Sequence, residues 1–351
     1  MALYLLIHRY LCHMSKESLK LSILDQSPVR KGTTARQAIL ETTELAKLAD
    51  QLGYSRFWVS EHHNTGSLAG STPEVLIAHL AGETQRIRLG SGGIMLPNHS
   101  ALKVAENFRM LEVLFPGRID LGMGRAPGTD RVTASVLNPS NHFKEQDFIE
   151  QLDDLQHYFH DEGDEVAGTT TGRILAIPQA QTVPEQWLLS SSGQSGLFAG
   201  YFGMGLAFAH FINPFGGPEA VEMYRKNFKK STDLKKPEAL LAIFVFCSED
   251  PEVVKHQQAL MDYRFLELEK HGRLSSLGYQ DIKDVAYSAP EQERIAHNRL
   301  RTVFGSPEVV KSRLTKLAAA YKVNEIMAVT ITEHFQDRVT SYELLAKQFG
   351  L

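Results

Sequence analysis

The feature that most constrains this chain is a regular alternation of short apolar segments with longer amphipathic ones. The first apolar segment, 19–24, precedes a stretch at 33–52 whose apolar residues recur at helical spacing. The same pair of segments recurs about eight times along the chain. Parallel strands joined by crossover helices produce this pattern, because each strand is followed by the helix that covers it.

The individual elements are predicted from apolar periodicity and from the residues that begin and end helices. In the first helix, Thr33 or Thr34 is expected as the N-cap and Gly53 as the residue that ends it. Strands are predicted over 19–24, 56–60, 87–89 with 93–96, 118–121, 187–190, 205–209, 240–246 and 325–330. Helices are predicted over 33–52, 71–83, 100–114, 142–160, 194–202, 219–230, 251–268, 307–321 and 341–349.

Two architectures produce such a pattern, an open doubly wound sheet and a closed barrel. A barrel needs about 250 residues, and this chain has 351, so the excess must lie in insertions. Segments 161–173 and 274–298 lack strong periodicity and are predicted to be insertions. Because no Pro/Ser-rich linker divides the chain, we expect an α/β fold, a (β/α)8 TIM barrel with insertions, with residues 20–351 as a single domain.

Residues 1–19 are expected to be a disordered N-terminal extension. Their longest uncharged apolar run, 2–7, is shorter than the about 7–15 residues of a signal-peptide core or the about 20 of a membrane span. The chain has only two cysteines, Cys12 and Cys247, and Cys247 is expected to be a buried, inert thiol. With a net charge of −4, we expect a cytoplasmic protein with no membrane and no nucleic-acid partner.

A histidine pair follows the second predicted strand, in the segment Ser-Glu-His-His-Asn at 60–64. Active sites of barrels lie where strands end. Successive residues of an extended chain point to opposite faces, so Glu61 and His63 are expected on the face opposite His62, and no metal site is expected. An imidazole titrates near pH 6.5, so the histidine that faces the pocket could transfer protons, whereas the other is expected to pack.

Glycines gather at the ends of the third and fourth strands. The segment Gly-Ser-Gly-Gly at 90–93 indicates either a bulge at the barrel mouth or a flat ligand against the backbone. The segment Gly-Met-Gly-Arg-Ala-Pro-Gly at 122–128 is a weak match to the dinucleotide fingerprint, because Pro127 stands where the third glycine belongs. Its Arg125 suits an anion, since a guanidinium binds phosphate oxygens in a fork.

Four serines surround the start of the helix predicted over 194–202. One serine suffices for an N-cap, and further hydroxyls with free backbone N–H groups make an anion site. The segment 193–196 is one residue short of a nucleophile elbow, which weighs against serine-hydrolase chemistry. We expect Arg125 and the turn at 191–195 to hold one phosphate. The segment 25–27 and His210 also follow strands, and each either faces the pocket or is structural.

Six segments in register resemble the bacterial luciferase-like monooxygenase family of flavin-dependent barrels, over nearly all of 19–351. The physiological substrates of the most similar single-component relatives are mostly unassigned. The segments are FWVSEHHN at 57–64, LGSGGIMLP at 89–97, GRIDLGMGRAPG at 117–128, LSSSGQS at 189–195, LAFAHF at 206–211 and GSPEVVKSRL at 305–314.

The resemblance implies an FMN-dependent monooxygenase that acts on a small organic substrate with O2. His62 matches the catalytic histidine, and Gly92-Gly93 matches a non-prolyl cis peptide that lines the flavin. The luciferase cysteine beside the flavin corresponds to Gly124, which weighs against light emission and a long-chain aldehyde substrate. Phosphate contacts are implied for Arg125, Ser191, Ser192 and Ser195.

The resemblance also implies partners. A separate flavin reductase using NAD(P)H would supply reduced FMN. A homodimer is expected through the helices at 71–83 and 100–114, which offer more apolar surface than one inner face requires. The apolar residues in question are Leu76, Ile77, Leu80, Leu102, Phe108 and Leu111.

Three alternatives stay open. A deazaflavin (F420)-dependent dehydrogenase would share the barrel, and the absorption spectrum of the bound cofactor would distinguish it. A non-enzymatic flavin-binding protein is disfavoured by the full set of strands and by His62. A sugar- or phosphate-metabolising barrel would need paired catalytic carboxylates or a Schiff-base lysine at strand ends, and the sequence offers neither.

Overall fold

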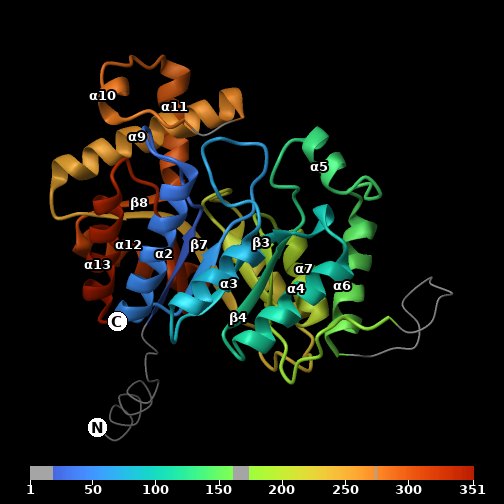
Figure 1. Ribbon diagram of the computed structural model, residues 1–351. Helices are drawn as coiled ribbons and strands as arrows, with labels where there is room; N and C mark the ends of the chain where they lie inside the picture. Colours follow the sequence, from blue (N-terminus) through green and yellow to red (C-terminus); the bar gives the residue numbers. More distant parts are fainter. Residues whose placement is uncertain (1–18, 161–173, 273–274) are drawn as a thin grey trace, which may run out of the picture.

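Eight parallel strands close into a barrel in the computed structural model, which describes residues 19–160, 174–272 and 275–351 (Figure 1). The hydrogen bonds between β6 and β7 complete the ring, and β9 lies between β1 and β7. The predicted (β/α)8 TIM barrel is therefore confirmed. The eight strands are β1 (Lys20–Asp25), β2 (Arg56–Val59), β3 (Arg88–Met95), β4 (Ile119–Gly124), β5 (Glu185–Ser190), β6 (Gly205–Ala209), β7 (Ala239–Cys247) and β9 (Glu325–Val329).

Helices follow the strands, and the predicted caps of the first one are confirmed. The Thr34 side chain accepts a hydrogen bond from the Gln37 amide, and Gly53 ends α2 with a φ of 89°, which favours glycine. The helices are α2 (Ala35–Leu52), α3 (Pro73–Glu83), α4 (Ala101–Leu114), α5 (Arg131–Leu137), α6 (Glu145–His160), α7 (Gly193–Phe202), α8 (Gly217–Asn227), α9 (Pro251–His271), α10 (Tyr279–Ile282), α11 (Ala289–Asn298), α12 (Pro307–Tyr321) and α13 (Phe335–Phe349).

Several predicted boundaries are wrong. The helix predicted over 142–160 begins only at Glu145, and the short α5 before it was not predicted. The last helix begins at Phe335 rather than at 341. The four-residue strand β8 (Thr302–Gly305), which pairs with the second half of β7, is too short to give a periodic signal.

Two further differences concern segments that lack a clear period. The third strand is continuous across its glycines, with a register shift between Gly92 and Ile94 that marks a bulge. The insertion predicted at 274–298 contains α10 and α11. The other predicted insertion, 161–173, and all but the last residue of the predicted extension 1–19 lie outside the described residues.

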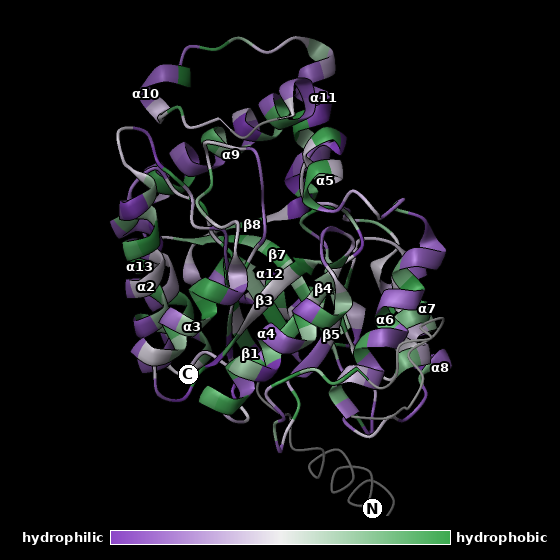
Figure 2. Cartoon of the chain, turned by 45° about the vertical axis from the view of Figure 1, so that its right-hand side comes forward, coloured by the Kyte–Doolittle hydropathy of each residue, from purple (hydrophilic) through white to green (hydrophobic). Residues whose placement is uncertain are grey.

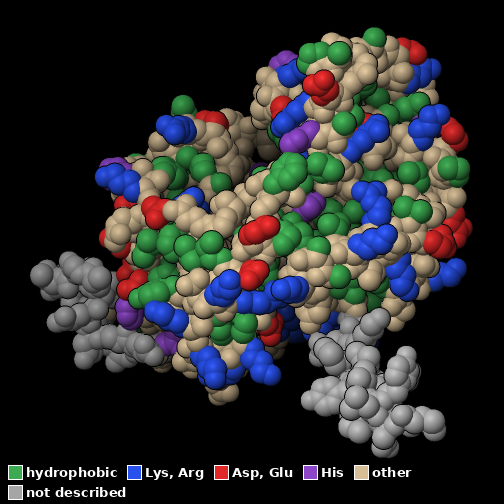
Figure 3. Space-filling view, turned by 180° about the vertical axis from the view of Figure 1, so that it is seen from behind, with side chains coloured by type: hydrophobic (Ala, Val, Ile, Leu, Met, Phe, Trp, Pro, Cys, Tyr) green, Lys and Arg blue, Asp and Glu red, His purple; other side chains and the backbone are tan. Residues whose placement is uncertain are grey.

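The additional elements gather at one end of the barrel. Helices α9, α10, α11 and α5 lie beyond the ends of the strands in both ribbon views (Figures 1 and 2). Seen from behind, the surface is hollowed between the part that carries α9–α11 and the rest of the molecule (Figure 3). This is the end where the strands finish and where barrels carry their ligands.

The core has an outer and an inner part. The larger apolar cluster lies between the barrel wall and the helices, and includes Ile23 and Phe57. A smaller cluster fills the barrel interior, where the rings of Trp58 and Trp187 meet edge to face with centroids 5.8 Å apart. The Cys247 side chain is buried, and burial raises the pKa of its thiol to about 12, as expected of an inert cysteine.

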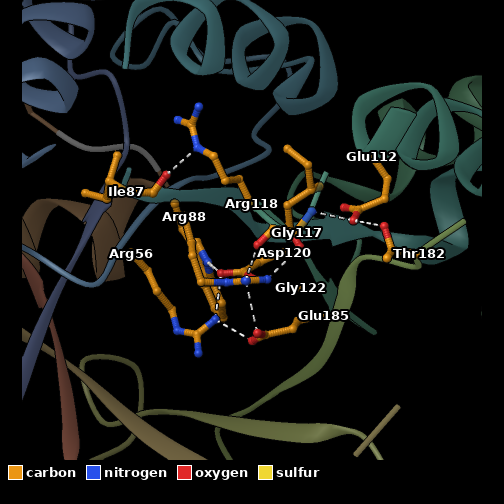
Figure 4. A network of polar contacts seen from close by, with 12 residues as sticks. Arg56, Ile87, Arg88, Glu112, Gly117, Arg118, Asp120, Gly122, Thr182 and Glu185 are labelled. Carbon is orange, nitrogen blue, oxygen red and sulfur yellow. Dashed lines mark hydrogen bonds and ion pairs between the residues drawn. The ribbon is translucent and has the colours of Figure 1, made fainter. Parts of the chain in front are cut away.

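An ionic network closes the opposite end of the barrel, where the strands start (Figure 4). Arg56 Nη1 lies 2.8 Å from both Asp120 Oδ2 and Glu185 Oε2, and its Nε donates to Glu325 Oε1 at 3.0 Å. Asp120 also accepts hydrogen bonds from Trp58 Nε1 and Arg88 Nε, each at 2.8 Å. Burial alone would lower the pKa of Arg56, but the surrounding carboxylates raise it, so the Arg56 guanidinium is charged.

The residues expected to form a dimer surface on α3 and α4 are mostly buried within this chain. Leu102 is the one that is half-buried and packs at the margin of the core. The prediction that these side chains offer more apolar surface than one inner face requires is therefore wrong. The buried ones are Leu76, Ile77, Leu80, Phe108 and Leu111.

Candidate active site

A cavity of about 280 Å³ opens at the ends of the strands. Its wall brings together most of the residues selected from the sequence, from β2, β3, β4 and β5. Apolar side chains of β1, β5 and β9 complete the wall, among them Leu24, Leu189 and Met327. The selected residues on the wall are His62, Gly92, Arg125, Ser191, Ser192 and Ser195.

His62 reaches the cavity from the turn after β2, where its backbone N–H donates to the Gly70 carbonyl at 2.8 Å. Burial lowers the pKa of its imidazole, while a hydrogen bond with the Gly128 backbone opposes that shift. The net effect lowers the pKa below its ordinary value of 6.5, so His62 is mainly neutral at pH 7.

Glu61, expected on the face opposite His62, is fully buried and lines the inner cavity as well. Glu61 Oε1 is 2.8 Å from His63 Nε2 and 2.9 Å from His99 Nε2, and Glu61 Oε2 accepts the Met95 N–H at 2.8 Å. Burial alone would raise the pKa of Glu61, but these hydrogen bonds and the charge of His99 lower it. Burial likewise opposes the charged form of His99, yet its pKa is raised by Glu61. Glu61 therefore ties β2 to the end of β3 and fixes the turn that carries His62.

The two glycines of β3 differ in position. The Gly92–Gly93 peptide bond is cis, as the family resemblance implies, and Gly92 lies on the cavity wall. A Cβ on Gly92 would lie 2.7 Å from Leu24 Cδ1, and one on Gly93 would lie 2.7 Å from the Gly122 carbonyl oxygen. The neighbouring backbone leaves room only for glycine at 93, whereas a Cβ at 92 would displace the Leu24 side chain. Gly93 contacts the neighbouring strand and does not line the cavity.

Met95, which sequence reasoning missed, covers the position of the luciferase cysteine. A Cβ on Gly124 would lie 2.9 Å from Met95 Cε, and both residues line the cavity. A larger residue at 124 would have to displace the flexible thioether. The position of Met95 at the end of β3, beside the glycines, was the only signal in the sequence.

Arg125 and the serines form a polar corner of the cavity. Ser192 is the N-cap of α7 but makes no side-chain cap, so hydroxyls and first-turn N–H groups face this corner. Arg125 Nη1 donates to Gln194 Oε1 at 3.0 Å and to Glu145 Oε2 at 3.1 Å. The Glu145 carboxylate thus accepts a hydrogen bond from the Arg125 guanidinium at the position where a phosphate is expected. Nothing in the sequence marked Glu145, because it comes from α6, far along the chain.

The remaining candidates at strand ends, the segment 25–27 and His210, differ in whether they reach the cavity. Gln26 lines the cavity. The Asp25 carboxylate accepts hydrogen bonds from the Ser27 amide and from Arg338, away from the cavity. His210 accepts from the Tyr321 hydroxyl at 2.7 Å and donates to the Leu300 carbonyl at 3.0 Å, so both ring nitrogens are used structurally.

Comparison with known proteins shows the family of this chain. The family model described as luciferase-like monooxygenase matches residues 19–321. The chain belongs to this family. The uncharacterized protein YwcH of Bacillus subtilis is 47% identical over 94% of this chain and 99% of its own. The N-acetyl-S-alkylcysteine monooxygenase of the same organism is 35% identical over 93% of this chain and 97% of its own. The crystal structure of apo-MsnO8 has a TM-score of 0.84, with 35% identity, and covers 95% of this chain and 99% of that one.

More distant structures of the same fold carry two kinds of cofactor. The oxygenating constituent of 3,6-diketocamphane monooxygenase, in complex with FMN, has a TM-score of 0.68 at 19% identity. An F420-dependent secondary alcohol dehydrogenase also has a TM-score of 0.68, at 12% identity. At such identities the likeness concerns the fold alone.

The chain also has an outer cleft of about 1070 Å³ next to the inner cavity. The two spaces share His62, Gln26 and Phe211, so the cleft leads directly to the inner cavity. Met261 and Phe265 of α9 and the loop at 62–68 form part of its wall. His63 lines this cleft rather than the inner cavity.

Two searches of the described ranges found nothing further. Within 19–160, 174–272 and 275–351, no group of three or more His, Cys, Asp and Glu side chains is placed to hold a metal ion. Among the same residues, no helix is long and apolar enough to cross a membrane.

Proposed function

We propose that this chain is an FMN-dependent monooxygenase that transfers one oxygen atom of O2 to a small organic substrate. The observation that carries the proposal is the convergence, on one cavity, of His62, the close-packed glycine wall at Gly92, and the polar corner at Arg125. The histidine suits proton transfer, the glycine wall suits a flat ring, and the polar corner suits a phosphate.

The residues present fit FMN. The uncapped start of α7 and the Arg125 guanidinium suit a phosphate, and the Glu145 carboxylate at this guanidinium indicates that the corner accepts an anion. Ser191, Ser192 and Ser195 would add hydroxyl donors. Gly92 places bare backbone on the cavity wall, against which a flat ring would lie.

Each part of the cavity then has a role. Reduced FMN, when bound, supplies the electrons for the reaction with O2. His62, neutral at pH 7, exchanges a proton with the reacting groups at the wall. Leu24, Leu189 and Met327 exclude water from the same space.

A direct assay tests the function. The purified protein is supplied with FMN, NAD(P)H and a flavin reductase, and organic substrates are screened by O2 consumption and by a product heavier by one oxygen atom. N-acetyl-S-benzylcysteine is a reasonable first substrate, because a relative is named as an N-acetyl-S-alkylcysteine monooxygenase. A co-purified deazaflavin would favour the dehydrogenase instead. FMN binding without turnover of any substrate would favour a non-enzymatic flavin-binding protein.

Replacing Arg125 with alanine is expected to weaken FMN binding about tenfold to hundredfold and riboflavin binding little, because the change removes a charge-assisted contact to phosphate. Fluorescence titration of both flavins measures the difference. Equal losses for the two flavins would remove Arg125 from the phosphate site.

Glu145→Gln is the matched control for this prediction. It removes the carboxylate that accepts from Arg125, so FMN is expected to bind about twofold to fivefold more tightly, as for an exposed charge interaction. Riboflavin affinity is expected to stay the same. Weaker FMN binding in this variant would contradict competition between Glu145 and the phosphate.

We also propose a homodimer through α3 and α4, with a separate flavin reductase using NAD(P)H, in the cytoplasm. Exposed apolar side chains on the two helices support the dimer: Val75, Met110, Val113 and Leu114. Sedimentation is expected to give twice the chain mass of 39.2 kDa. A species of 39.2 kDa alone at micromolar concentration would overturn the dimer.

A further inference from the structure

In the part of the chain that the structure describes, one buried guanidinium has no carboxylate within ion-pair distance. Arg264 lies on α9, is 5% exposed, and faces a small cavity of about 150 Å³. Within the described residues, its only hydrogen bond runs from Nη1 to the Ile331 carbonyl oxygen at 3.3 Å, and its Nε has no partner. The Ile331 carbonyl also accepts from Gln257 Nε2, so even this one bond is shared.

Such a group is costly unless it has a task. Buried charges are normally paired, and Arg338 in the same chain shows the usual arrangement. Arg338 is 1% exposed and has Asp25 Oδ2 at 3.1 Å and Glu41 Oε2 at 3.6 Å. Burial lowers the pKa of Arg264 to about 10, which leaves its guanidinium charged at neutral pH.

The other charged groups around the small cavity are already engaged. Arg30 is paired with Glu41, and Lys31 lies 2.7 Å from Asp281. Glu333, which also lines the small cavity, raises the pKa of Arg264 by its charge, but no ion pair within 4.0 Å joins these two described side chains. Glu333 Oε2 accepts the Tyr279 N–H at 3.0 Å. Among the described Lys and Arg side chains at this cavity, Arg264 is therefore the one without a direct ion pair.

The small cavity is continuous with the active site. It shares Lys31, Ser67 and Ile331 with the outer cleft. The outer cleft in turn shares His62 and Phe211 with the inner cavity. A single molecule in the cleft can thus reach toward Arg264 at one end and toward His62 at the other.

We propose that Arg264 binds a carboxylate of the substrate, so that the oxidised substrates are organic acids whose reacting atom lies toward His62. A guanidinium binds a carboxylate through two parallel hydrogen bonds, and Arg264 has the free donors to do so. The hydroxyls of Ser275 and Ser276 line the same small cavity and offer further donors. The inference rests on the monooxygenase function proposed above and names its substrate class.

A binding experiment tests the carboxylate site without turnover. Calorimetric titration of the FMN-loaded enzyme compares N-acetyl-S-benzylcysteine with its neutral carboxamide, and hexanoate with hexanamide. The wild type is expected to prefer the acids by about tenfold to hundredfold, and Arg264→Met to lose this preference. Lys31→Met removes the same charge from the same cavity and is expected to keep it. Equal binding of acids and amides by the wild type, no binding of either acid, or a preserved preference in Arg264→Met would each overturn the proposal.

Thermal stability separates a ligand-binding arginine from a structural one. Arg264→Met is expected to leave Tm unchanged or to raise it, because the substitution removes an uncompensated buried charge. Arg338→Met breaks a buried ion pair and is expected to lower Tm. A comparable fall in Tm for Arg264→Met would show that Arg264 is structural and would overturn the proposal.

Turnover then distinguishes the two proposals from each other. If the wild type oxidises nothing but prefers acids through Arg264, the carboxylate site stands and the monooxygenase function fails. If it oxidises acid and amide with equal kcat/KM, and Arg264→Met matches it, the function stands and the carboxylate site fails.

Discussion

Replacing His62 with alanine is expected to lower kcat by about 10²–10⁴-fold, the usual effect of losing one general acid–base group. FMN affinity and Tm are expected to stay nearly the same, because the proposed phosphate contacts come from β4 and α7. Reduced flavin is still expected to consume O2, but to release hydrogen peroxide in place of oxygenated substrate. Product and peroxide measured in parallel with O2 consumption quantify this uncoupling.

The pH profile sharpens the test of His62. Burial lowers its pKa, so the neutral form persists below pH 6.5 and the acid limb of kcat/KM is expected below that value. This limb is expected to disappear in His62→Ala. His157→Ala is a control, because His157 lies on α6 and lines neither the inner cavity nor the outer cleft. A native rate in His62→Ala would make His62 structural, and loss of flavin would place it in the binding site.

Replacing Asp120 with asparagine is expected to lower the free energy of unfolding by about 3–5 kcal/mol, as for other broken buried ion pairs. Asp120 is fully buried and accepts from Arg56, Arg88 and Trp58. The substitution leaves the positive charges of Arg56 and Arg88 partly uncompensated at the end of the barrel where the strands start. Urea denaturation followed by circular dichroism measures the change.

An exposed ion pair supplies the comparison. Glu222→Gln removes the exposed pair with Lys226, one turn apart on α8, and is expected to change the free energy of unfolding very little. If Asp120→Asn shifts the midpoint of urea denaturation as little as Glu222→Gln does, the network does not stabilise the barrel. The remaining partners of Arg56 would then suffice without Asp120.

Local chemistry explains which parts of the fold could be predicted. The α2 caps at Thr34 and Gly53, the strand at 205–209 and the helix at 307–321 depend on nearby residues, and all are confirmed. The start of α13 was missed because its first turn is mostly polar. The strand β8 was missed because it is formed by pairing with β7 rather than by a pattern of its own.

The site was predictable where strand ends fix a residue in place. His62, Gly92 and Arg125 reach one cavity because parallel strands finish at the same end of a barrel. Glu145 and Arg264 escaped prediction because each comes from a helix whose position depends on tertiary packing. The apolar side chains of α3 and α4 that remain exposed could not be predicted for the same reason. Periodicity alone cannot distinguish a side chain that covers the barrel from one that points outward.

The ionic network stabilises the fold at the end of the barrel where the strands start, whereas ligands bind at the other end. Its five charged members occupy the first or second positions of their strands: Arg56, Arg88, Asp120, Glu185 and Glu325. Random mutations at the barrel mouth therefore leave this network intact, whereas mutations at the strand starts disrupt it. In evolution, the mouth can acquire new substrates by gradual substitution while the scaffold stays folded. A laboratory library for altered specificity should accordingly keep His62 and vary the segment at 63–68 and the surface of α9 that faces the cleft.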